Sequence, residues 1–324
     1  MRTMPDALPG SPASAVRPRV AVIVPCYNEA VAIPKVVADF RAALPNAVIY
    51  VYDNNSSDGT AEVARAAGAI VRRETLQGKG NVIRRAFADV DADLYVLVDG
   101  DDTYEAAAAP RMIEALIREG LDMVNGARVT EIEKAYRPGH RLGNQVLTGM
   151  VRLVFGDRIS DMLSGYRVFS RRFVKSFPAL AGGFETETEF TVHALDLKMP
   201  VGEVRTAYKD RPVGSTSKLR TYSDGARILR TIVVLVKEER PLQFFSICGL
   251  GLLLLAFLFG VPVVAEFLRT GLVPRLPTAV LAMGLVLVAA LSFACGLILD
   301  SVSRGRKEIK RLAYLSIPPP PHLP

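Results

Sequence analysis

The sequence predicts an α/β domain with a mostly parallel sheet, followed by a short membrane anchor. From residue 19 to residue 219, short apolar runs alternate with amphipathic stretches, as strands and helices alternate in a parallel sheet. Residues 244–265 and 278–299 each form a run of 22 residues without a charged side chain. Each run makes a helix of about 33 Å, enough for a hydrocarbon core of about 30 Å. Buried helices of a soluble protein are the alternative, but they seldom lack a polar face over this length.

The elements of the α/β domain can be placed in order along the chain. The first run, RVAVIVP, is apolar throughout and ends at a proline, as a strand buried on both faces does. The stretch NNSSDGT has turn chemistry and leads from the second run into a helix. Ligands of such sheets bind beyond the carboxyl ends of the strands, where Asn28, Asp53 and Asp99 lie. The predicted strands are residues 19–25, 47–53, 68–73, 93–99 and 123–128, and the predicted helices are residues 32–44, 60–67 and 80–90.

Basic side chains orient the two apolar spans. Lysine and arginine flank the outer ends of the hairpin, in residues 220–240 and 304–311, whereas the connecting loop holds only Arg269 and Arg275. By the positive-inside rule, the N-terminal domain and the C-terminal tail are both expected in the cytoplasm, at the inner membrane. Membrane orientation accounts for much of the net charge of +7, so no nucleic-acid partner is expected.

The chain is therefore expected to have five parts. The first residues lack the apolar segment of a signal peptide and are predicted to be a disordered leader. The stretch before the first span has an apolar face with basic residues towards both ends, which predicts a helix lying on the membrane surface; packing on the globular domain is the alternative. The parts are a leader (1–18), the α/β domain (19–219), the interfacial helix (220–241), two transmembrane helices (242–299) and a cytoplasmic tail (300–324).

Small residues and cysteines in the chain lead to two further expectations. Should the protein form a homo-oligomer through its transmembrane helices, Gly249, Gly251, Gly284 and Gly296 are candidate contact points. The 3 cysteines are odd in number and widely scattered, which predicts neither a disulfide framework nor a metal cluster.

Three carboxylates directly follow the fourth predicted strand, in the stretch YVLVDGDD. Side chains alternate faces along a strand, so Asp99 and Asp101 are expected to share one face. Two carboxylates held this way repel each other unless a cation lies between them, and Mg²⁺ or Mn²⁺ prefers such oxygen ligands. An acidic turn that caps the next helix is the alternative for a lone D-x-D; the third acid, Asp102, favours the metal site.

Several motifs together give the chain a resemblance to a known family. VIVPCYNEA, VYDNNSSDGT, GKGNVIRRAF, VDGDD and DMLSGYRVF occur in this order between residues 22 and 169. In order and spacing they resemble family 2 glycosyltransferases of the GT-A fold. With the two C-terminal spans, the chain is similar to the polyprenyl-phosphate branch, which includes dolichyl-phosphate mannose synthase and the GtrB-type enzymes. The resemblance implies a Rossmann-like GT-A domain in the cytoplasm, with a nucleotide-sugar donor, a polyprenyl-phosphate acceptor and Mg²⁺ or Mn²⁺ as cofactor.

The resemblance also implies roles for residues on the donor side. Asp99 and Asp101 would hold the metal and take part in catalysis, with Asp99 also contacting the nucleotide, and Asp161 aligns with an acid proposed as catalytic. Two positions depart from the pattern. Asn54 replaces the second acid of the family's D-D motif, and Thr103 lies where relatives often have the glutamine of a D-A-D-L-Q sequence. The nucleotide pocket would be formed by Pro25, Tyr27, Asn28, Glu29, Asp53 and Lys79.

On the acceptor side, the resemblance implies a cationic site for a lipid phosphate. Arginine suits phosphate because its guanidinium donates two parallel hydrogen bonds. The family's R-x-x-G-x-S-K pattern is looser here, with one extra residue before the serine. The acidic stretch FETETEF is predicted to lie at the start of a helix, where most of its carboxylates would interact with the helix N-terminus. The implied acceptor-site residues are Ser164, Arg167, Arg211, Ser217 and Lys218.

The sequence thus predicts an inverting, metal-dependent transfer of sugar from a nucleotide-sugar, with UDP favoured, to polyprenyl phosphate. One alternative is a processive polysaccharide synthase, but its Q-x-x-R-W motif needs a tryptophan and the chain has none. A membrane-anchored nucleotide-binding protein without activity is the second alternative. A nucleotide-dependent oxidoreductase would need a glycine-rich fingerprint after the first strand, which VPCYNE is not. The donor sugar, the type of polyprenol and the oligomeric state are left open by the sequence.

Overall fold

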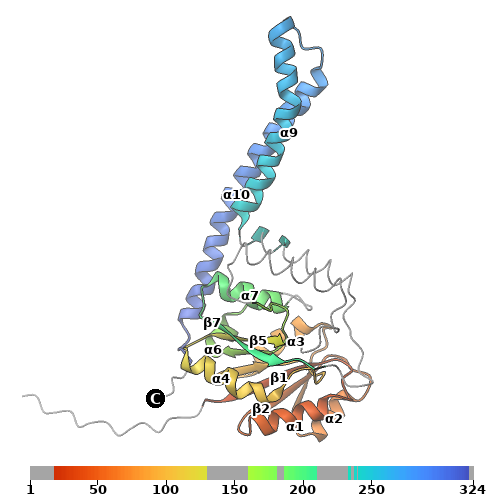
Figure 1. Ribbon diagram of the computed structural model, residues 1–324, viewed down its shortest axis with the longest axis vertical. Helices are drawn as coiled ribbons and strands as arrows, with labels where there is room; N and C mark the ends of the chain where they lie inside the picture. The colour runs from red at the N-terminus through yellow and green to blue at the C-terminus, as the bar shows by residue number, and fades with distance from the viewer. Residues whose placement is uncertain are drawn as a thin grey trace, which may run out of the picture. The chain divides into compact units, whose positions relative to one another are not determined.

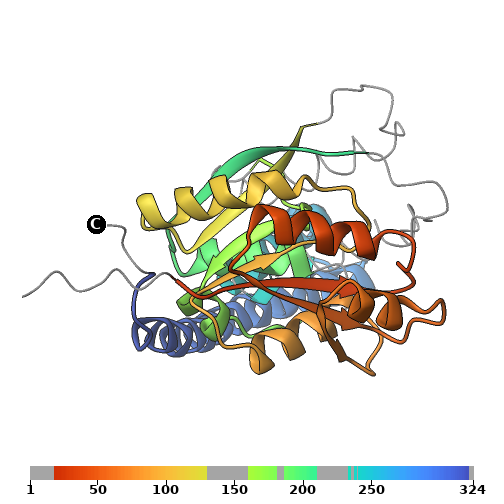
Figure 2. The ribbon, with the colours of Figure 1, turned by 90° about the horizontal axis from the view of Figure 1, so that it is seen from below.

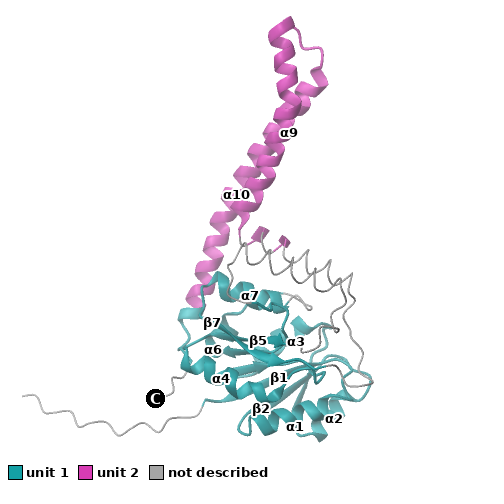
Figure 3. Ribbon diagram, in the orientation of Figure 1, with its two compact units in different colours: residues 1–136, 157–217, 314–324 teal, residues 137–156, 218–313 magenta. Residues whose placement is uncertain are grey.

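A computed structural model of the chain describes residues 18–129, 160–180, 186–209, 233–234, 237–238 and 240–320. The chain divides into two compact units (Figure 3). The first unit comprises residues 1–136, 157–217 and 314–324 and contains the α/β domain. The second comprises residues 137–156 and 218–313 and contains most of the two apolar helices.

A 7-stranded sheet forms the centre of the first unit, in the order β3-β2-β1-β4-β6-β5-β7. β1 is parallel to β2 and β4, β2 is parallel to β3, and β5 is parallel to β7. β6 runs antiparallel to both β4 and β5, so the sheet is mostly parallel, as predicted, with one reversed strand inside it. The sequence did not predict β6 or β7. The strands are β1 Val20–Cys26, β2 Val48–Asp53, β3 Ile70–Arg73, β4 Leu94–Leu97, β5 Met123–Val129, β6 Arg167–Ser170 and β7 Val201–Ala207.

Helices pack on both faces of this sheet (Figure 1, Figure 2). α1 contacts α4, and α3 contacts α6. The three predicted helices are confirmed, with ends that differ by no more than one residue. The helices of the unit are α1 Ile33–Ala43, α2 Thr60–Ala66, α3 Lys79–Asp89, α4 Ala109–Arg118, α6 Arg171–Ser176 and α7 Thr186–Asp196, with a short 3-10 helix, η1 Ala106–Ala108.

Alternation along β1 builds a separate core on each face of the sheet. Val22 and Val24 join Phe40 of α1 and Met112 of α4 in one hydrophobic cluster. Ile23 lies between the two valines and is fully buried, but it is outside that cluster because its side chain points to the opposite face. A strand that is apolar at every position is therefore what this site in the sheet requires.

Aromatic rings hold α7 in place. Phe190 of α7 lies 4.8 Å, between ring centroids, from both Phe169 of β6 and Phe177. Phe169 in turn stacks on Phe173 of α6 at 4.5 Å. Burying one such side chain contributes about 1.5–3 kcal/mol, so this cluster fixes α7 and the acidic side chains at its N-terminal end.

The second unit contains α9 Pro241–Thr270 and α10 Leu276–Leu315, which are both long and apolar enough to cross a membrane. They include the predicted spans, and α9 continues through Pro262. α10 also continues into the predicted tail, because no proline interrupts it there and Asp300 pairs with Arg304 one turn later at 2.7 Å. The predicted interfacial helix lies almost entirely outside the described residues.

The structure distinguishes the four glycines proposed as contact points. A Cβ atom at Gly249 would lie 2.9 Å from the Phe293 ring, and one at Gly296 would lie 3.1 Å from Phe245. These two glycines therefore allow α9 and α10 of one chain to approach each other. A Cβ atom at Gly251 or Gly284 would meet no other segment within 4 Å in the part of the chain that the structure describes, and their role in an oligomer stays a prediction.

Candidate active site

The carboxyl ends of β1, β2 and β4 lie side by side in the sheet. Cys26 at the end of β1 is in register with Asp53 at the end of β2. Ile23 of β1 is in register with Leu97 at the end of β4, and Asp99 follows two residues later. The predicted strand-end residues therefore gather at the edge of the sheet where ligands bind in this class of fold.

Pro25 and Asp53 lie at this edge, at the carboxyl ends of β1 and β2. Pro25 is a residue of β1 and is in register with Tyr52 of β2. Asp53 closes β2, is 6% exposed, and accepts a hydrogen bond from the Ser56 amide at 3.3 Å. Its carboxylate therefore shapes the turn that follows β2.

The loop after β1 is tied to the loop after β2. The amide of Asn28 donates to Ser56 Oγ at 2.9 Å, and the amide of Glu29 donates to Thr60 Oγ1 at 2.9 Å. Asn28 has a φ of 53°, a left-handed conformation that asparagine adopts more readily than most residues. Tyr27 is 41% exposed, so a planar ligand can reach it.

Asn54, which departs from the family's acidic pattern, holds the loop between β3 and α3 at three points. Its Nδ2 donates to the carbonyl of Glu74 at 2.9 Å and to that of Leu76 at 2.8 Å. Its Oδ1 accepts a hydrogen bond from the Gly78 amide at 2.7 Å. A carboxylate has no proton to donate to the two carbonyls, so the amide is what this arrangement requires. The brace fixes the segment that carries Lys79.

The acids of the VDGDD stretch lie in a turn. β4 ends two residues before Asp99, so the expected alternation of strand faces does not apply to Asp99 and Asp101. Asp101 is 4% exposed and accepts a hydrogen bond from Thr103 Oγ1 at 2.6 Å, so Thr103 orients this carboxylate. Asp102 instead pairs with Lys35 at 3.0 Å.

Lys79 lies between two carboxylates from distant parts of the chain. Its Nζ is 2.5 Å from Asp99 Oδ1 and 2.5 Å from Glu187 Oε1. The side chains of Lys79 and Glu187 are 8% and 6% exposed, whereas that of Asp99 is 31% exposed. Burial alone would lower the pKa of Lys79, but the two carboxylates outweigh it and raise that pKa. Burial raises the pKa of Glu187, against the opposing charge of Lys79.

Glu187 is a site residue that the sequence did not single out. The acidic stretch does begin a helix, as predicted, but Glu187 pairs with Lys79 rather than only with the helix N-terminus. Phe190 follows three residues later, on the same inward side of α7. That spacing was the available signal, because a carboxylate on an apolar helix face needs a cation beside it. Glu185 lies outside the described residues.

Gly165 supports Asp99 from another side. A Cβ atom at Gly165 would lie 2.4 Å from Asp99 Oδ2, so only glycine leaves room for the carboxylate. The amide of Gly165 donates to Tyr104 Oη at 2.9 Å, which holds the backbone in this place. The segment before β6 is therefore part of the acid site.

Ser164 and Arg167 are fully buried, which gives no support to a role in binding the acceptor phosphate. Arg167 donates to the carbonyls of Met162 at 2.7 Å and Ser164 at 3.1 Å, and to Thr191 Oγ1 at 3.0 Å. Ser164 Oγ donates to the Gly126 carbonyl at 2.6 Å. Burial lowers the pKa of Arg167 to about 10. These side chains brace the segment before β6 from inside the domain.

Asp161 is held in an ion pair with Arg128. Its two carboxylate oxygens accept from Arg128 Nε at 2.7 Å and Nη2 at 2.8 Å. Burial on its own would raise the pKa of Asp161, but the hydrogen bonds and charge of Arg128 hold it below its ordinary value. This carboxylate is therefore a weak proton acceptor. The other implied acceptor-site residues, Arg211, Ser217 and Lys218, lie outside the described residues.

Comparison with known proteins identifies the family. Residues 21–177 match the model described as Glycosyl transferase family 2. The chain is also 32% identical over 303 residues to the glycosyltransferase AglJ of Haloferax volcanii, covering 91% of this chain and 98% of that protein. The chain belongs to glycosyl transferase family 2.

Two further likenesses place this glycosyltransferase within the family and the fold. It is 29% identical over 221 residues to a dolichyl-phosphate hexose transferase of Haloferax volcanii, covering 68% of this chain and 95% of the relative. Its structure resembles glucosyl-3-phosphoglycerate synthase from Mycobacterium tuberculosis in complex with Mn²⁺, UDP and phosphoglyceric acid. That match has a TM-score of 0.54 and 20% identity and covers 68% of this chain and 78% of the other, so it supports the GT-A fold.

The acids of this glycosyltransferase fit a divalent cation that brings other ligands with it. Among the residues that the structure describes, no three histidine, cysteine or acidic side chains are placed to hold a metal ion by themselves. Asp99 and Asp101 offer hard oxygen ligands, and Asp99 already attracts a cation, the ammonium of Lys79. Mg²⁺ in proteins is usually held by one or two carboxylates together with substrate phosphates and water. The two acids therefore suit a metal bound with a diphosphate.

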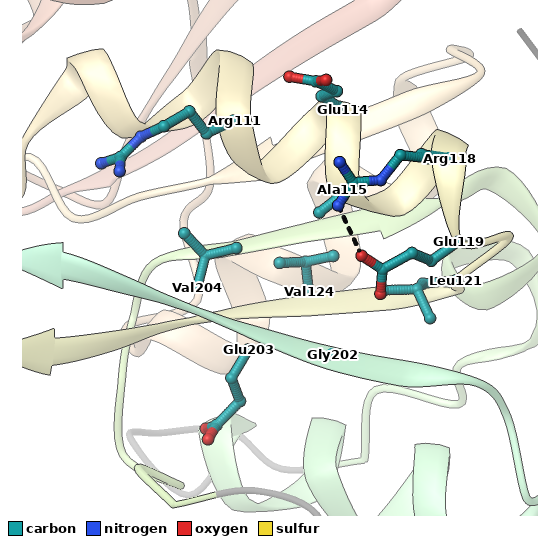
Figure 4. Close-up of a pocket in the computed structure, with 10 residues that line it drawn as sticks. All are labelled: Arg111, Glu114, Ala115, Arg118, Glu119, Leu121, Val124, Gly202, Glu203 and Val204. Carbon is teal, nitrogen blue, oxygen red and sulfur yellow. Dashed lines mark hydrogen bonds and ion pairs between the residues drawn. The ribbon is translucent and has the colours of Figure 1, made fainter.

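A cavity elsewhere in the domain takes no part in this site. It has a volume of about 350 Å³ and is lined by α4 and by residues of β5 and β7, including Arg118, Val124 and Val204 (Figure 4). None of the predicted site residues that the structure describes lines it. Glu203 at its edge points away from α4 and accepts hydrogen bonds from Asn125 Nδ2 at 2.8 Å and the Ser160 amide at 2.9 Å (Figure 4).

Proposed function

We propose that this glycosyltransferase moves a sugar from a nucleotide-sugar, a UDP-sugar, to a polyprenyl phosphate at the cytoplasmic face of a membrane. The observation that carries the proposal is the cluster of Asp99, Asp101 and Lys79 beside the joined loops of β1 and β2. This cluster places metal-binding oxygens and an ammonium at the position where the fold binds nucleotides. The dolichyl-phosphate hexose transferase among its relatives supports the lipid acceptor.

The donor would lie across the joined loops. Tyr27 is exposed enough to stack on a nucleobase, and Asp53 is positioned at the end of β2 to accept hydrogen bonds from it. Asn28 and Glu29 hold the loop through their amides, and Asn28 Oδ1 also accepts a hydrogen bond from the Ser57 amide at 2.8 Å. The loop fixed in this way would border the ribose pocket. Pro25 would border the same pocket from β1.

The metal would be held by Asp99 and Asp101. Bound Mg²⁺ or Mn²⁺ neutralises charge that develops on a departing diphosphate. A structural neighbour described as a complex with Mn²⁺ and UDP supports this combination of ligands. Thr103 fixes Asp101 through its hydroxyl group, and Gly165 lets Asp99 lie close to the backbone.

The acceptor phosphate would act as the nucleophile. With a second pKa near ~6, a phosphate monoester is largely dianionic at neutral pH and has no proton to lose. One of its oxygens forms a bond to the anomeric carbon while the bond from that carbon to the diphosphate oxygen breaks and its electron pair leaves with the nucleoside diphosphate. A single in-line displacement inverts the anomeric centre. The ion pair of Asp161 with Arg128 agrees with a reaction that needs no general base.

The lipid would be presented by the membrane next to the domain. α9 and α10 are the proposed anchor, with the α/β domain and both termini in the cytoplasm by the positive-inside rule. Arg211, Ser217 and Lys218 remain the proposed phosphate contacts.

The test is product analysis with purified full-length protein in detergent. A panel of UDP-, GDP- and other nucleotide-sugars is incubated with a short polyprenyl phosphate and Mn²⁺, and lipid products are identified by mass spectrometry. We expect one class of donor to give a polyprenyl-phosphate sugar. We expect Asp101→Asn to lower the rate by at least about a hundredfold, whereas the adjacent Asp102→Asn, which removes a carboxylate paired with exposed Lys35, keeps most of it. No lipid product with any donor, or full activity in Asp101→Asn, would refute the proposal.

A further inference from the structure

The ammonium of Lys79 binds Asp99, one of the two acids proposed above to hold the metal. This ammonium is 2.5 Å from Asp99 Oδ1 and is almost completely buried. The other oxygen, Oδ2, lies against Gly165, so closely that a Cβ atom there would be 2.4 Å away. Lys79 therefore engages one carboxylate oxygen of Asp99, and the backbone of Gly165 crowds the other. An ammonium and a divalent ion on one carboxylate repel each other strongly at such distances.

Glu187 gives Lys79 a second partner. Its Oε1 is 2.5 Å from Lys79 Nζ. Its Oε2 is buried and has no hydrogen-bond partner among the residues that the structure describes. An ionised carboxylate is strongly disfavoured in such a place unless a cation stays beside it. Glu187 therefore favours keeping Lys79 in the site even if Asp99 is taken by another cation.

We propose that Lys79 is a resident cation that gives up Asp99 when a divalent ion binds and stays beside the site through Glu187. The proposal rests on the function proposed above, because it concerns the same metal and donor. Lys79 fills the cation place while the donor is absent, which limits repulsion among Asp99, Asp101 and Glu187. Once released from Asp99, its ammonium is still within the site and can donate to the diphosphate. Glu187 acts as a positioning residue for Lys79 in this scheme.

The proposed exchange, in which a divalent ion replaces Lys79 on Asp99, predicts that removing this lysine strengthens the binding of the metal. Lys79→Met should bind Mn²⁺ alone more tightly than wild type, by at least about tenfold, because the competing ammonium is gone. A lysine that serves only the phosphate would leave the affinity for Mn²⁺ alone unchanged. Lys35→Met is the matched control, because Lys35 pairs with the nearby Asp102 but is 54% exposed. We expect its Mn²⁺ affinity to stay within about twofold of wild type, as for other screened surface charges.

The experiment measures free Mn²⁺ by electron paramagnetic resonance during titration of full-length protein in detergent, without nucleotide. A second measurement uses wild type alone, so it does not depend on the folding of a variant: amine labelling of each lysine is followed by peptide mass spectrometry. Labelling of Lys79 should be slow without metal and rise at least about threefold at saturating Mn²⁺, while that of exposed Lys35 stays constant.

Three results would overturn the exchange. The first is that Lys79→Met binds Mn²⁺ no more tightly than wild type does. The second is that Lys35→Met gains as much affinity for Mn²⁺ as Lys79→Met does, and the third is that the labelling of Lys79 does not respond to Mn²⁺. If lipid product forms and these results are found, the exchange is wrong and the proposed function stands. If Mn²⁺ binding changes as expected but no donor yields lipid product, the proposed function is wrong and the exchange stands.

Discussion

Replacing Asn54 by aspartate exchanges two donated hydrogen bonds for a negative charge without changing the size of the side chain. Asn54 is 3% exposed, and its Nδ2 serves the carbonyls of Glu74 and Leu76 at 2.9 Å and 2.8 Å. A buried group that loses its partner costs about 1–3 kcal/mol, so two such carbonyls cost about 2–6 kcal/mol. For a domain of this size, 1 kcal/mol lowers the melting temperature by about 2–4 °C. Asn54→Asp should therefore lower it by at least about 4 °C.

The assay follows Cys26, which is 2% exposed and lies in β1 of the same domain. Reaction of Cys26 with a thiol reagent during heating, read by mass spectrometry at one scan rate, reports unfolding of the α/β domain. Asn55→Asp is the control, because Asn55 is a neighbour whose Nδ2 donates to the Thr75 carbonyl at 2.8 Å at the surface, where water can replace it. A melting temperature of Asn54→Asp equal to that of Asn55→Asp would contradict the bracing role.

Three further predictions concern the acid site and its support. Gly165→Ala should weaken binding of UDP with Mn²⁺ by at least about tenfold in calorimetry, because its Cβ would displace the Asp99 carboxylate; unchanged affinity would contradict the close approach. Arg128 holds the pKa of Asp161 below the ordinary value that this carboxyl has in the unfolded chain. The ion pair therefore contributes its full stability at pH values above the ordinary pKa, and this contribution is lost as the pH falls through the lowered pKa. Asp161→Asn should accordingly lose less stability than wild type between about pH 5 and pH 2 in acid titrations, and parallel curves would argue against this ion pair. Arg167→Lys should lower the melting temperature without raising the KM for polyprenyl phosphate, because Arg167 is fully buried; a raised KM at unchanged stability would restore a direct role in acceptor binding.

The sequence predicted the parts of the fold that have strong local signals. β1, β2 and β4 are mainly apolar runs, β3 and β5 have shorter apolar segments and include polar residues, and α1, α2 and α3 have clear starts. α4 and α6 were not predicted. β6 was missed because its sequence, RVFS, begins with an arginine and ends with a serine, so no apolar run marks it. β7 was missed because it is an edge strand with charged residues at alternate positions, such as Glu203 and Arg205. The reversal of β6 depends on pairing between distant segments, which no local pattern encodes.

In the site, too, the sequence predicted what local patterns encode and missed what depends on contacts between distant residues. The gathering of Asp53 and Asp99 at one edge of the sheet follows from strand polarity, and the sequence predicted it. The partnership of Lys79 with Glu187 joins residues 108 positions apart and becomes visible only in the folded chain. Arg167 shows the converse, because an arginine in a motif suggests a surface cation until its burial is known.

The proposed sugar transfer depends most on a divalent ion held by the acids that follow β4. The direct measurement is formation of polyprenyl-phosphate sugar by full-length protein after exhaustive chelation, followed by titration with Mn²⁺. We expect product formation to stop on chelation and to return with Mn²⁺ in wild type but not in Asp101→Asn. Transfer at an undiminished rate in the chelated protein would contradict the central claim.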